Sequence, residues 1–182
     1  MYFALVNFPD IKHESFHRFR NRYDPYASLI REHLSFIFPV PSSIGKQVFI
    51  NHIEKVLETW QPFDVTISGF FKTIDQWLML SIKDGNDNVI ALHDDFYKGV
   101  LQSYCRKDLP FTPHVGLGFF GKKAYDFHNP TAVISLDEEK YSLALAEISE
   151  EELIFRKTVD SLTMLELNDD FSECDEVKTF II

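Results

Sequence analysis

The sequence has few cysteines, no long apolar run and no excess of positive charge, and each absence removes a class of protein. Cys105 and Cys174 are the only cysteines among 182 residues. They are too few for a disulfide framework and lack the spacing of a metal site. The first residues lack the basic and apolar segments of a secretory signal, and no stretch is apolar for long enough to cross a bilayer. We therefore expect a soluble, cytoplasmic protein with no membrane partner.

The charge balance is acidic. The sequence holds 18 Lys and Arg against 28 Asp and Glu, a formal net charge of −10. Proteins that coat long nucleic acids neutralise phosphates with clustered Lys and Arg, so the balance argues against that class. A nucleotide, a cyclic phosphate or a short RNA end held in a small local site remains compatible with it. The oligomeric state is left open.

Two common site signatures are also missing. The stretch GLGFFG, residues 116–121, has neither the lysine nor the register of a phosphate-binding loop. His, Asp and Glu do not recur at the usual metal-ligand spacing, and the HDD of residues 93–95 is expected at the start of a helix. Neither a metal ion nor another cofactor is predicted.

Apolar periodicity predicts a mixture of strands and helices. Strands are expected over residues 2–8, 33–38, 63–71, 77–82, 114–119, 153–167 and 175–182, and helices over 11–23, 46–59, 90–105 and 136–152. Short turns between strands favour antiparallel pairing and an α+β fold. Most of the 18 phenylalanines must fill a core. No linker or repeat interrupts the chain, so residues 1–182 are expected to form a single domain.

Two short stretches of the sequence are alike: HLSFIF, residues 33–38, and HVGLGF, residues 114–119. Alternate residues of a strand share a face. One face then carries the histidines and mostly small neighbours, namely His33, Ser35 and Ile37 in the first strand and His114, Gly116 and Gly118 in the second. The other face carries bulky apolar side chains, namely Leu34, Phe36, Phe38, Val115, Leu117 and Phe119. The pattern predicts a core face behind a cleft face.

Two histidines facing one cleft suit acid–base chemistry on a phosphodiester. One neutral imidazole takes a proton from the attacking group, and one imidazolium gives a proton to the leaving oxygen. A hydroxyl two residues further along the strand would reach a phosphoryl oxygen, which Ser35 can do and Gly116 cannot. From these residues alone, two structural histidines or a metal site remain alternatives.

Together, these stretches resemble the two-histidine (2H) phosphoesterase superfamily, and within it the branch of 2′-5′ RNA ligase-like proteins and cyclic phosphodiesterases. The histidines stand 81 residues apart, close to the family's separation of about 80. The stretches FRNRYDPYASLIREHLSFIFPVP, residues 19–41, and LPFTPHVGLG, residues 109–118, are similar to the surroundings of the family's two motifs. The resemblance covers roughly residues 1–120.

The resemblance implies a bilobal domain with mostly antiparallel sheets around a central groove and helices packed outside. It implies a metal-independent phosphodiesterase acting on 2′,3′-cyclic phosphates or on 2′,5′-linked nucleotides or RNA ends, with His33 and His114 as the catalytic pair. Ser35 would hold the phosphate, and Gly116 stands where the family usually carries Thr or Ser. A water or backbone N–H groups would have to compensate there. The alternative is a nucleotide- or RNA-end-binding protein of the same fold with weak or no catalysis.

Further contacts to a substrate are predicted from position alone. Lys122 and Lys123 follow the second motif and would form a basic rim, or else lie on the surface as ordinary turn residues. Arg20, Arg22 and Arg31 surround the first motif. Phe119 or Phe120 would stack on a base unless they belong to the core.

Overall fold

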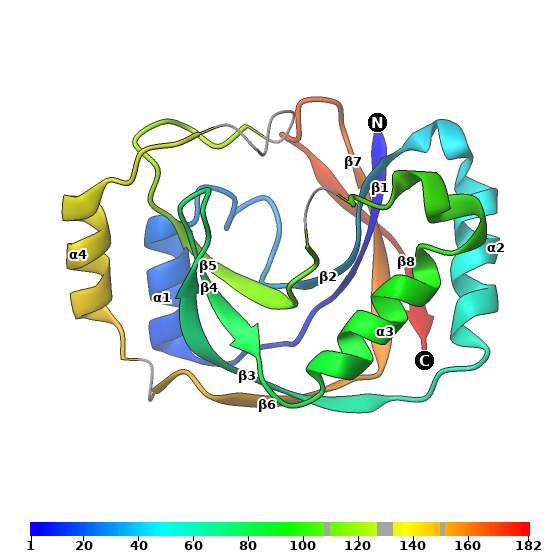
Figure 1. Ribbon diagram of the computed structural model, residues 1–182, viewed down its shortest axis with the longest axis horizontal. Coiled ribbons are helices and arrows are strands. Elements are labelled where there is room, and N and C mark those ends of the chain that lie inside the picture. The colour runs from blue at the N-terminus through cyan, green and yellow to red at the C-terminus, as the bar shows by residue number, and fades with distance from the viewer. Residues whose placement is uncertain (108–109, 127–132, 150–151) are drawn as a thin grey trace.

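The computed structural model describes residues 1–107, 110–126, 133–149 and 152–182 of the chain (Figure 1). Its elements are β1 (Tyr2–Asn7), α1 (Glu14–Tyr23), β2 (Leu34–Pro41), a 3-10 helix (Ser42–Ile44), α2 (Lys46–Leu57), β3 (Phe63–Lys72), β4 (Trp77–Ile82), α3 (Asn86–Phe96), a second 3-10 helix (Gly99–Tyr104), β5 (His114–Phe119), α4 (Glu138–Glu147), β6 (Phe155–Val159), β7 (Ser161–Leu167) and β8 (Cys174–Ile181).

The eight strands form one sheet in the order β6-β3-β4-β5-β2-β1-β7-β8. Each described pairing between neighbouring strands is antiparallel, which confirms the predicted α+β class. The strands that carry the two motifs, β2 and β5, are neighbours in the middle of this order and are in register at Leu34 and Val115. The two halves of the sheet therefore meet between the motif strands.

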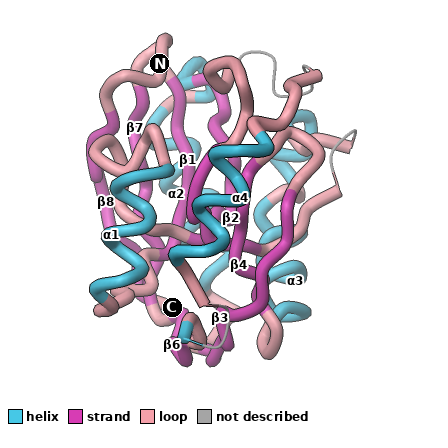
Figure 2. The backbone as a smooth tube through the Cα atoms, turned by 90° about the vertical axis from the view of Figure 1, so that its left-hand side faces the viewer, coloured by secondary structure: helices cyan, strands magenta, loops and turns pink. Residues whose placement is uncertain are grey.

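The main core lies on one face of the sheet, and the four α-helices pack against that face. They contribute Phe16, Phe19 and Tyr23 from α1, Phe49, Ile53 and Leu57 from α2, Val89, Leu92 and Phe96 from α3, and Ala144 from α4. Figure 1 shows α1 and α4 at one end of the sheet and α2 and α3 at the other. Figure 2 views the molecule from the first of these ends, with α1 and α4 in front of the strands.

The opposite face carries two smaller apolar clusters, one on each half of the sheet. The first, which we call the Trp77 cluster, consists of Trp77, Met79, Phe119 and Ile134, with Tyr26, Phe71 and Tyr125 packed against it. The second consists of Ala4, Val6, Leu165, Leu167 and Phe171, and so lies mainly on β1 and β7. The start of each motif strand lies between these clusters, because β5 and β2 stand between β4 and β1 in the sheet. We call this side the groove face.

Several predicted boundaries are wrong. The helix expected over 90–105 is divided, because α3 ends at Phe96, Lys98 is extended, and Gly99, the first residue of the second 3-10 helix, has a left-handed φ of 60°. The helix expected over 11–23 begins at Glu14, where the His13 side chain caps it by accepting from the backbone N–H of Phe16. The strand expected over 153–167 is two strands, β6 and β7. The helix expected over 136–152 ends at Glu147, and residues 150–151 of that range lie outside the described residues.

Strict alternation also fails beyond the first residues of β2. The pairing with β1 steps from Val6 opposite Ser35 to Leu5 opposite Ile37, so Phe36 is an extra residue in β2. Such a bulge lets two successive residues lie on the same face. Phe36 and Ile37 are consequently both fully buried in the main core. The prediction that Ile37 shares the face of His33 is therefore wrong.

A second bulge lies in β5. Its pairing with β4 steps from Met79 opposite Gly116 to Leu78 opposite Gly118. Phe119 is thereby carried to the groove face, opposite Trp77, and Gly118 faces α1, where an added Cβ would come within 2.7 Å of the Cβ of Tyr23. The predictions that Gly118 lies on the face of His114, and Phe119 on the opposite one, are wrong for this reason. Phe120, which follows the strand, is fully buried in the main core.

The two glycines should respond oppositely to alanine. We expect Gly118→Ala to lower the free energy of unfolding by about 1–3 kcal/mol, because the added methyl group overpacks the contact with α1. Gly116→Ala is the matched control, because its Cβ would meet only the Sδ of Met79, at 3.9 Å. That substitution should cost less than about 0.5 kcal/mol. Urea denaturation of both variants measures the difference, and equal losses would contradict the assigned faces.

Candidate active site

The structure brings the four predicted site residues together on the groove face. His33 immediately precedes β2, and His114 is the first residue of β5. Continuing the antiparallel register by one residue from the pair of Leu34 and Val115 places Ser35 beside His114 and His33 beside Gly116. Opposite residues in an antiparallel pair share a face. Leu34 and Val115 point into the main core, so the four site residues point away from it, and each is half-buried.

Both imidazoles are held in the same way. The Nδ1 of His33 lies 3.0 Å from the backbone carbonyl oxygen of Arg31, and the Nδ1 of His114 lies 2.6 Å from that of Thr112. A carbonyl oxygen only accepts, so each Nδ1 carries a proton and donates it. The Nε2 of each neutral ring is then the unprotonated nitrogen, available to take up a proton from a bound molecule.

Burial and neighbouring charges alter the two rings unequally. Burial is the largest cause that lowers the pKa of His33 to about 4; the Arg31 carbonyl opposes it, and the positive charges of Arg20 and His114 add to it. Burial also lowers the pKa of His114, but the Thr112 carbonyl and the negative charge of Asp75 act in the opposite direction. The influence of His114 on His33 means that the two rings are close enough for their charges to repel. Protonation is therefore favoured on His114 over His33.

A buried ion pair fixes the segment that leads to His33. The Nε of Arg20 donates to a carboxylate oxygen of Asp24 at 2.9 Å, and its Nη2 donates to the backbone carbonyl of Ile30 at 2.6 Å. The other carboxylate oxygen of Asp24 accepts from the backbone N–H of Tyr26 at 2.8 Å. Burial raises the pKa of Asp24, and the Arg20 charge opposes that rise. Arg20 is therefore engaged inside the protein, where it orders the chain before the first motif.

The other two arginines near the first motif are paired as well. Arg31 donates through two nitrogens to the carboxylate of Glu176, each at 3.2 Å, and its guanidinium lies 3.7 Å from the ring centre of Phe8. Arg22 pairs with Glu147 at 2.9 Å. Of the three arginines, Arg22 alone lines the pocket described next.

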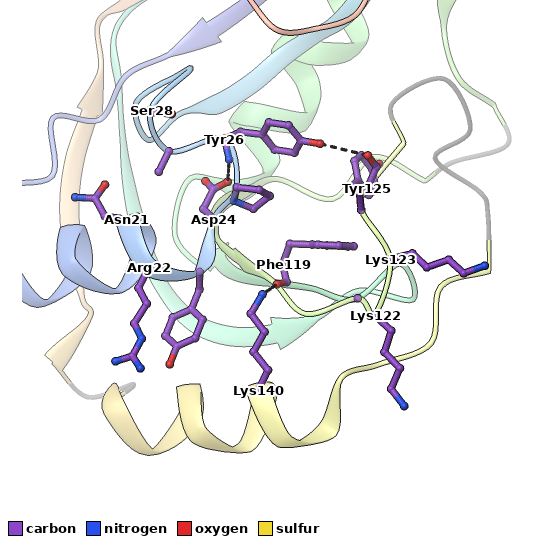
Figure 3. A pocket seen from close by; sticks show the side chains of 15 residues that line it. Asn21, Arg22, Asp24, Tyr26, Ser28, Phe119, Lys122, Lys123, Tyr125 and Lys140 are labelled. Carbon is purple, nitrogen blue, oxygen red and sulfur yellow. Dashed lines mark hydrogen bonds between the residues drawn. The ribbon is translucent and has the colours of Figure 1, made fainter.

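A pocket of about 650 Å³ adjoins the Trp77 cluster (Figure 3). It is lined by residues 21–28, which include the end of α1 and the turn after it, by several residues from Phe119 to Tyr125, and by Lys140 of α4. The Tyr26 hydroxyl donates to the backbone carbonyl of Tyr125 at 3.3 Å, and Lys140 donates to that of Phe119 at 2.8 Å. Lys122 and Lys123 also line the pocket, and no described carboxylate pairs with either of them. Lys122 and Lys123 thus lie at the edge of this pocket, whose lining includes neither His33 nor His114, and the basic rim of the histidine site stays a prediction.

Sequence reasoning missed the residues that β3, β4 and α4 add. The ring of Phe71 on β3 meets that of His114 edge-on, with centres 6.3 Å apart. On β4, Met79 lies opposite Gly116 and Ser81 opposite His114. The alternation of WLMLSI, residues 77–82, places Ser81 on the same face as Trp77. Only the pairing of β4 with β5 shows that this face lies beside the second motif. No local spacing links Lys140 to the pocket.

Two further findings bear on function. Among the residues that the structure describes, no group of three or more His, Cys, Asp and Glu is placed to hold a metal ion. Within the same residues, none of the helices has the length and apolar character needed to cross a bilayer.

The fold and the paired histidine strands define a two-histidine phosphoesterase-like protein. A sequence model of the 2′-5′ RNA ligase superfamily matches residues 8–170. The chain belongs to this superfamily, and the match extends well beyond the two motifs and their surroundings. No curated protein matches the chain.

Solved structures share the fold. LigT of E. coli, in a crystal structure with 3′-AMP, is 14% identical with a TM-score of 0.62, over 100% of this chain and 96% of LigT. TT0787 of Thermus thermophilus is 12% identical with a TM-score of 0.63, over 100% of this chain and 97% of that one. A crystal structure described as a phosphoesterase is 12% identical with a TM-score of 0.62, over 100% of this chain and 98% of that one.

The lowered pKa of His33 predicts how stability depends on pH. A histidine with a lower pKa in the folded protein binds its proton more readily after unfolding, so the stability it contributes is complete above the unfolded pKa of 6.5 and is lost as the pH falls towards 4. We expect the free energy of unfolding to decline over this interval, and His33→Gln to make the decline shallower. Denaturation at several pH values measures the slope, and Ser35→Ala is the control that keeps the titrating ring. An NMR titration midpoint near 6.5 for His33 would contradict the expectation.

Proposed function

We propose that the protein is a metal-independent phosphodiesterase that acts on 2′,3′-cyclic phosphates or on 2′,5′-linked nucleotides or RNA ends. One observation carries the proposal. Two half-buried imidazoles stand at the starts of neighbouring central strands, share one face, and each use Nδ1 for a backbone carbonyl. Both Nε2 atoms are thereby left for proton transfer.

The surrounding charges give the two rings different roles. Burial, together with the neighbouring positive charges of Arg20 and His114, keeps His33 neutral at pH 7, so it acts as the base: its Nε2 takes a proton from the attacking water. His114 has the Asp75 carboxylate nearby, so it more readily carries the proton that its Nε2 gives to the leaving oxygen. Water thus adds across one P–O bond, and exchange of protons with solvent returns both rings to their starting states.

Ser35 holds the phosphate between the rings. The register places it beside His114 and on the face of His33, and its hydroxyl makes no hydrogen bond to the other described residues. It is therefore available to donate to a phosphoryl oxygen. Losing one such donor to a developing oxyanion typically costs about 3–4 kcal/mol of activation free energy, roughly 100- to 1000-fold in rate.

The pocket beside the Trp77 cluster takes the remainder of the substrate. Its volume of about 650 Å³ suits a nucleotide-sized group, since ligand pockets commonly span about 300–1,000 Å³. Lys122 and Lys123 would offset phosphate charge there, and the rings of Tyr26 and Tyr125 offer aromatic surface. LigT has been crystallised with 3′-AMP, NADP+ and ATP, which supports a nucleotide ligand for the same fold.

The test of the reaction is hydrolysis of nucleoside 2′,3′-cyclic phosphates and of 2′,5′-linked dinucleotides in the presence of EDTA. We expect a bell-shaped pH profile of kcat/KM, and His33→Ala and His114→Ala should each lower kcat/KM by about 100-fold or more. His52→Gln is the control, because the ring of His52 contacts the carbonyl of Phe96 on α3, away from the groove face.

Two outcomes would overturn this mechanism. Activity that disappears with EDTA requires a metal, and activity that survives both histidine substitutions places the chemistry elsewhere. A wild-type protein that binds nucleoside monophosphates without turning over any of these substrates would instead be the nucleotide- or RNA-end-binding protein of the alternative reading.

The pocket is tested by removing two positive charges. We expect Lys122→Gln combined with Lys123→Gln to raise KM several-fold with kcat largely unchanged, because these side chains contact the substrate away from the reacting bond. Lys12→Gln combined with Lys55→Gln removes the same charge from exposed positions elsewhere and controls for the net charge. Equal KM values in the two double variants would exclude the pocket as a substrate site.

A further inference from the structure

The hydroxyl that the second motif lacks has a counterpart on the neighbouring strand. Ser81 of β4 lies directly opposite His114 of β5. Directly opposite residues of an antiparallel pair share a face and hold their Cβ atoms about 4.5–5.5 Å apart. Ser35 takes the corresponding place on the other side of His114, through the register of β2 with β5. His114 therefore stands between two serines, one on each adjacent strand.

The alternation of β4 places Ser81 on the groove face. Leu78, Leu80 and Ile82 are buried in the main core. Trp77 and Met79 belong to the Trp77 cluster on the opposite side. The pairing of β4 with β5 keeps one register from Met79 to Ser81, so no bulge intervenes between Ser81 and this cluster. Ser81 is half-buried and makes no side-chain hydrogen bond to the other described residues, which leaves its hydroxyl for a ligand.

The space in front of Gly116 is open to a bound group. A Cβ at this position would meet only the Sδ of Met79, at 3.9 Å, and the backbone has no left-handed φ that would require glycine. Neither packing nor backbone conformation therefore explains the glycine. Without a side chain at position 116, a phosphate can approach β5 more closely and come within reach of the β4 side chain next to His114.

We propose that Ser81 donates its hydroxyl to a phosphoryl oxygen of the substrate, in the place of the Thr or Ser that position 116 lacks. The proposal rests on the proposed phosphodiesterase function and deepens it, because it makes the phosphate site a pair of serines on either side of His114. Ser35 reaches the phosphate from β2 and Ser81 from β4. The residue at position 116 is then dispensable for holding the phosphate.

The test compares three single substitutions and one double variant. We expect Ser81→Ala to lower kcat/KM by about 100-fold, as for loss of one oxyanion donor, without shifting the limbs of the pH profile that the histidines set. Gly116→Ser restores a hydroxyl on β5, so Ser81→Ala should cost markedly less in the Gly116→Ser background than in the wild type. Ser68→Ala is the matched control, because Ser68 lies opposite Ser81 on β3, one strand further from His114, and it should change kcat/KM by less than about twofold.

Binding of inorganic phosphate, followed by NMR shifts of the His114 ring, gives a readout that does not depend on turnover. Weaker phosphate binding in Ser81→Ala but not in Ser68→Ala supports the inference. Wild-type kinetics and phosphate binding in a folded Ser81→Ala protein, with Ser35→Ala and His114→Ala impaired, would overturn the role of Ser81 and leave the proposed function standing. Wild-type protein that neither hydrolyses the substrates nor binds phosphate would overturn both.

Discussion

The antiparallel pairing of Leu34 with Val115 is the contact on which the rest of the site depends. Both side chains are almost fully buried in the main core. Because neighbouring residues of a strand point to opposite faces, the residues next to Leu34 and Val115 must point to the groove face. Burying these two residues together therefore presents both histidines to the groove face. It also joins two halves of a sheet whose motif-bearing strands are far apart in the sequence. The apolar contact behind the sheet thus determines the polar arrangement in front of it.

On the groove face, burial and neighbouring charges together determine the pKa values of the two histidines. Apolar clusters flank the histidines, and burial lowers the pKa of both rings. The buried pair of Arg20 and Asp24 holds the segment before His33, and the charge of Arg20 also disfavours a proton on that ring. On the other ring, Asp75 favours the proton. Two histidines with equivalent backbone contacts are thereby made chemically different by their neighbours, which is the condition for separate acid and base roles.

The parts of the fold that follow local rules were predictable. The strand patterns located every strand except β6 and β7, which were expected as one, and the histidine spacing pointed to the right superfamily, which the match over residues 8–170 confirms. Alternation failed at Ile37, Gly118 and Phe119, because a bulge is a property of two strands in register and cannot be seen in one. The helix predicted over 90–105 failed for a local reason, the extended backbone of Lys98 followed by the left-handed backbone of Gly99.

The sequence by itself determined the motif residues, the α+β class and the faces of the first residues of each motif strand, because these depend on side-chain periods of two and 3.6 within one segment. The tertiary structure alone decided which strands are neighbours. That arrangement put Ser81 beside His114 and gathered Tyr26, Tyr125 and Lys140 around one pocket. It also paired Arg20 with a carboxylate in the interior and Arg31 with a carboxylate at the surface. These contacts join residues up to 145 positions apart. Strand pairing over such distances depends on how the whole sheet is buried, and no local sequence pattern encodes that burial.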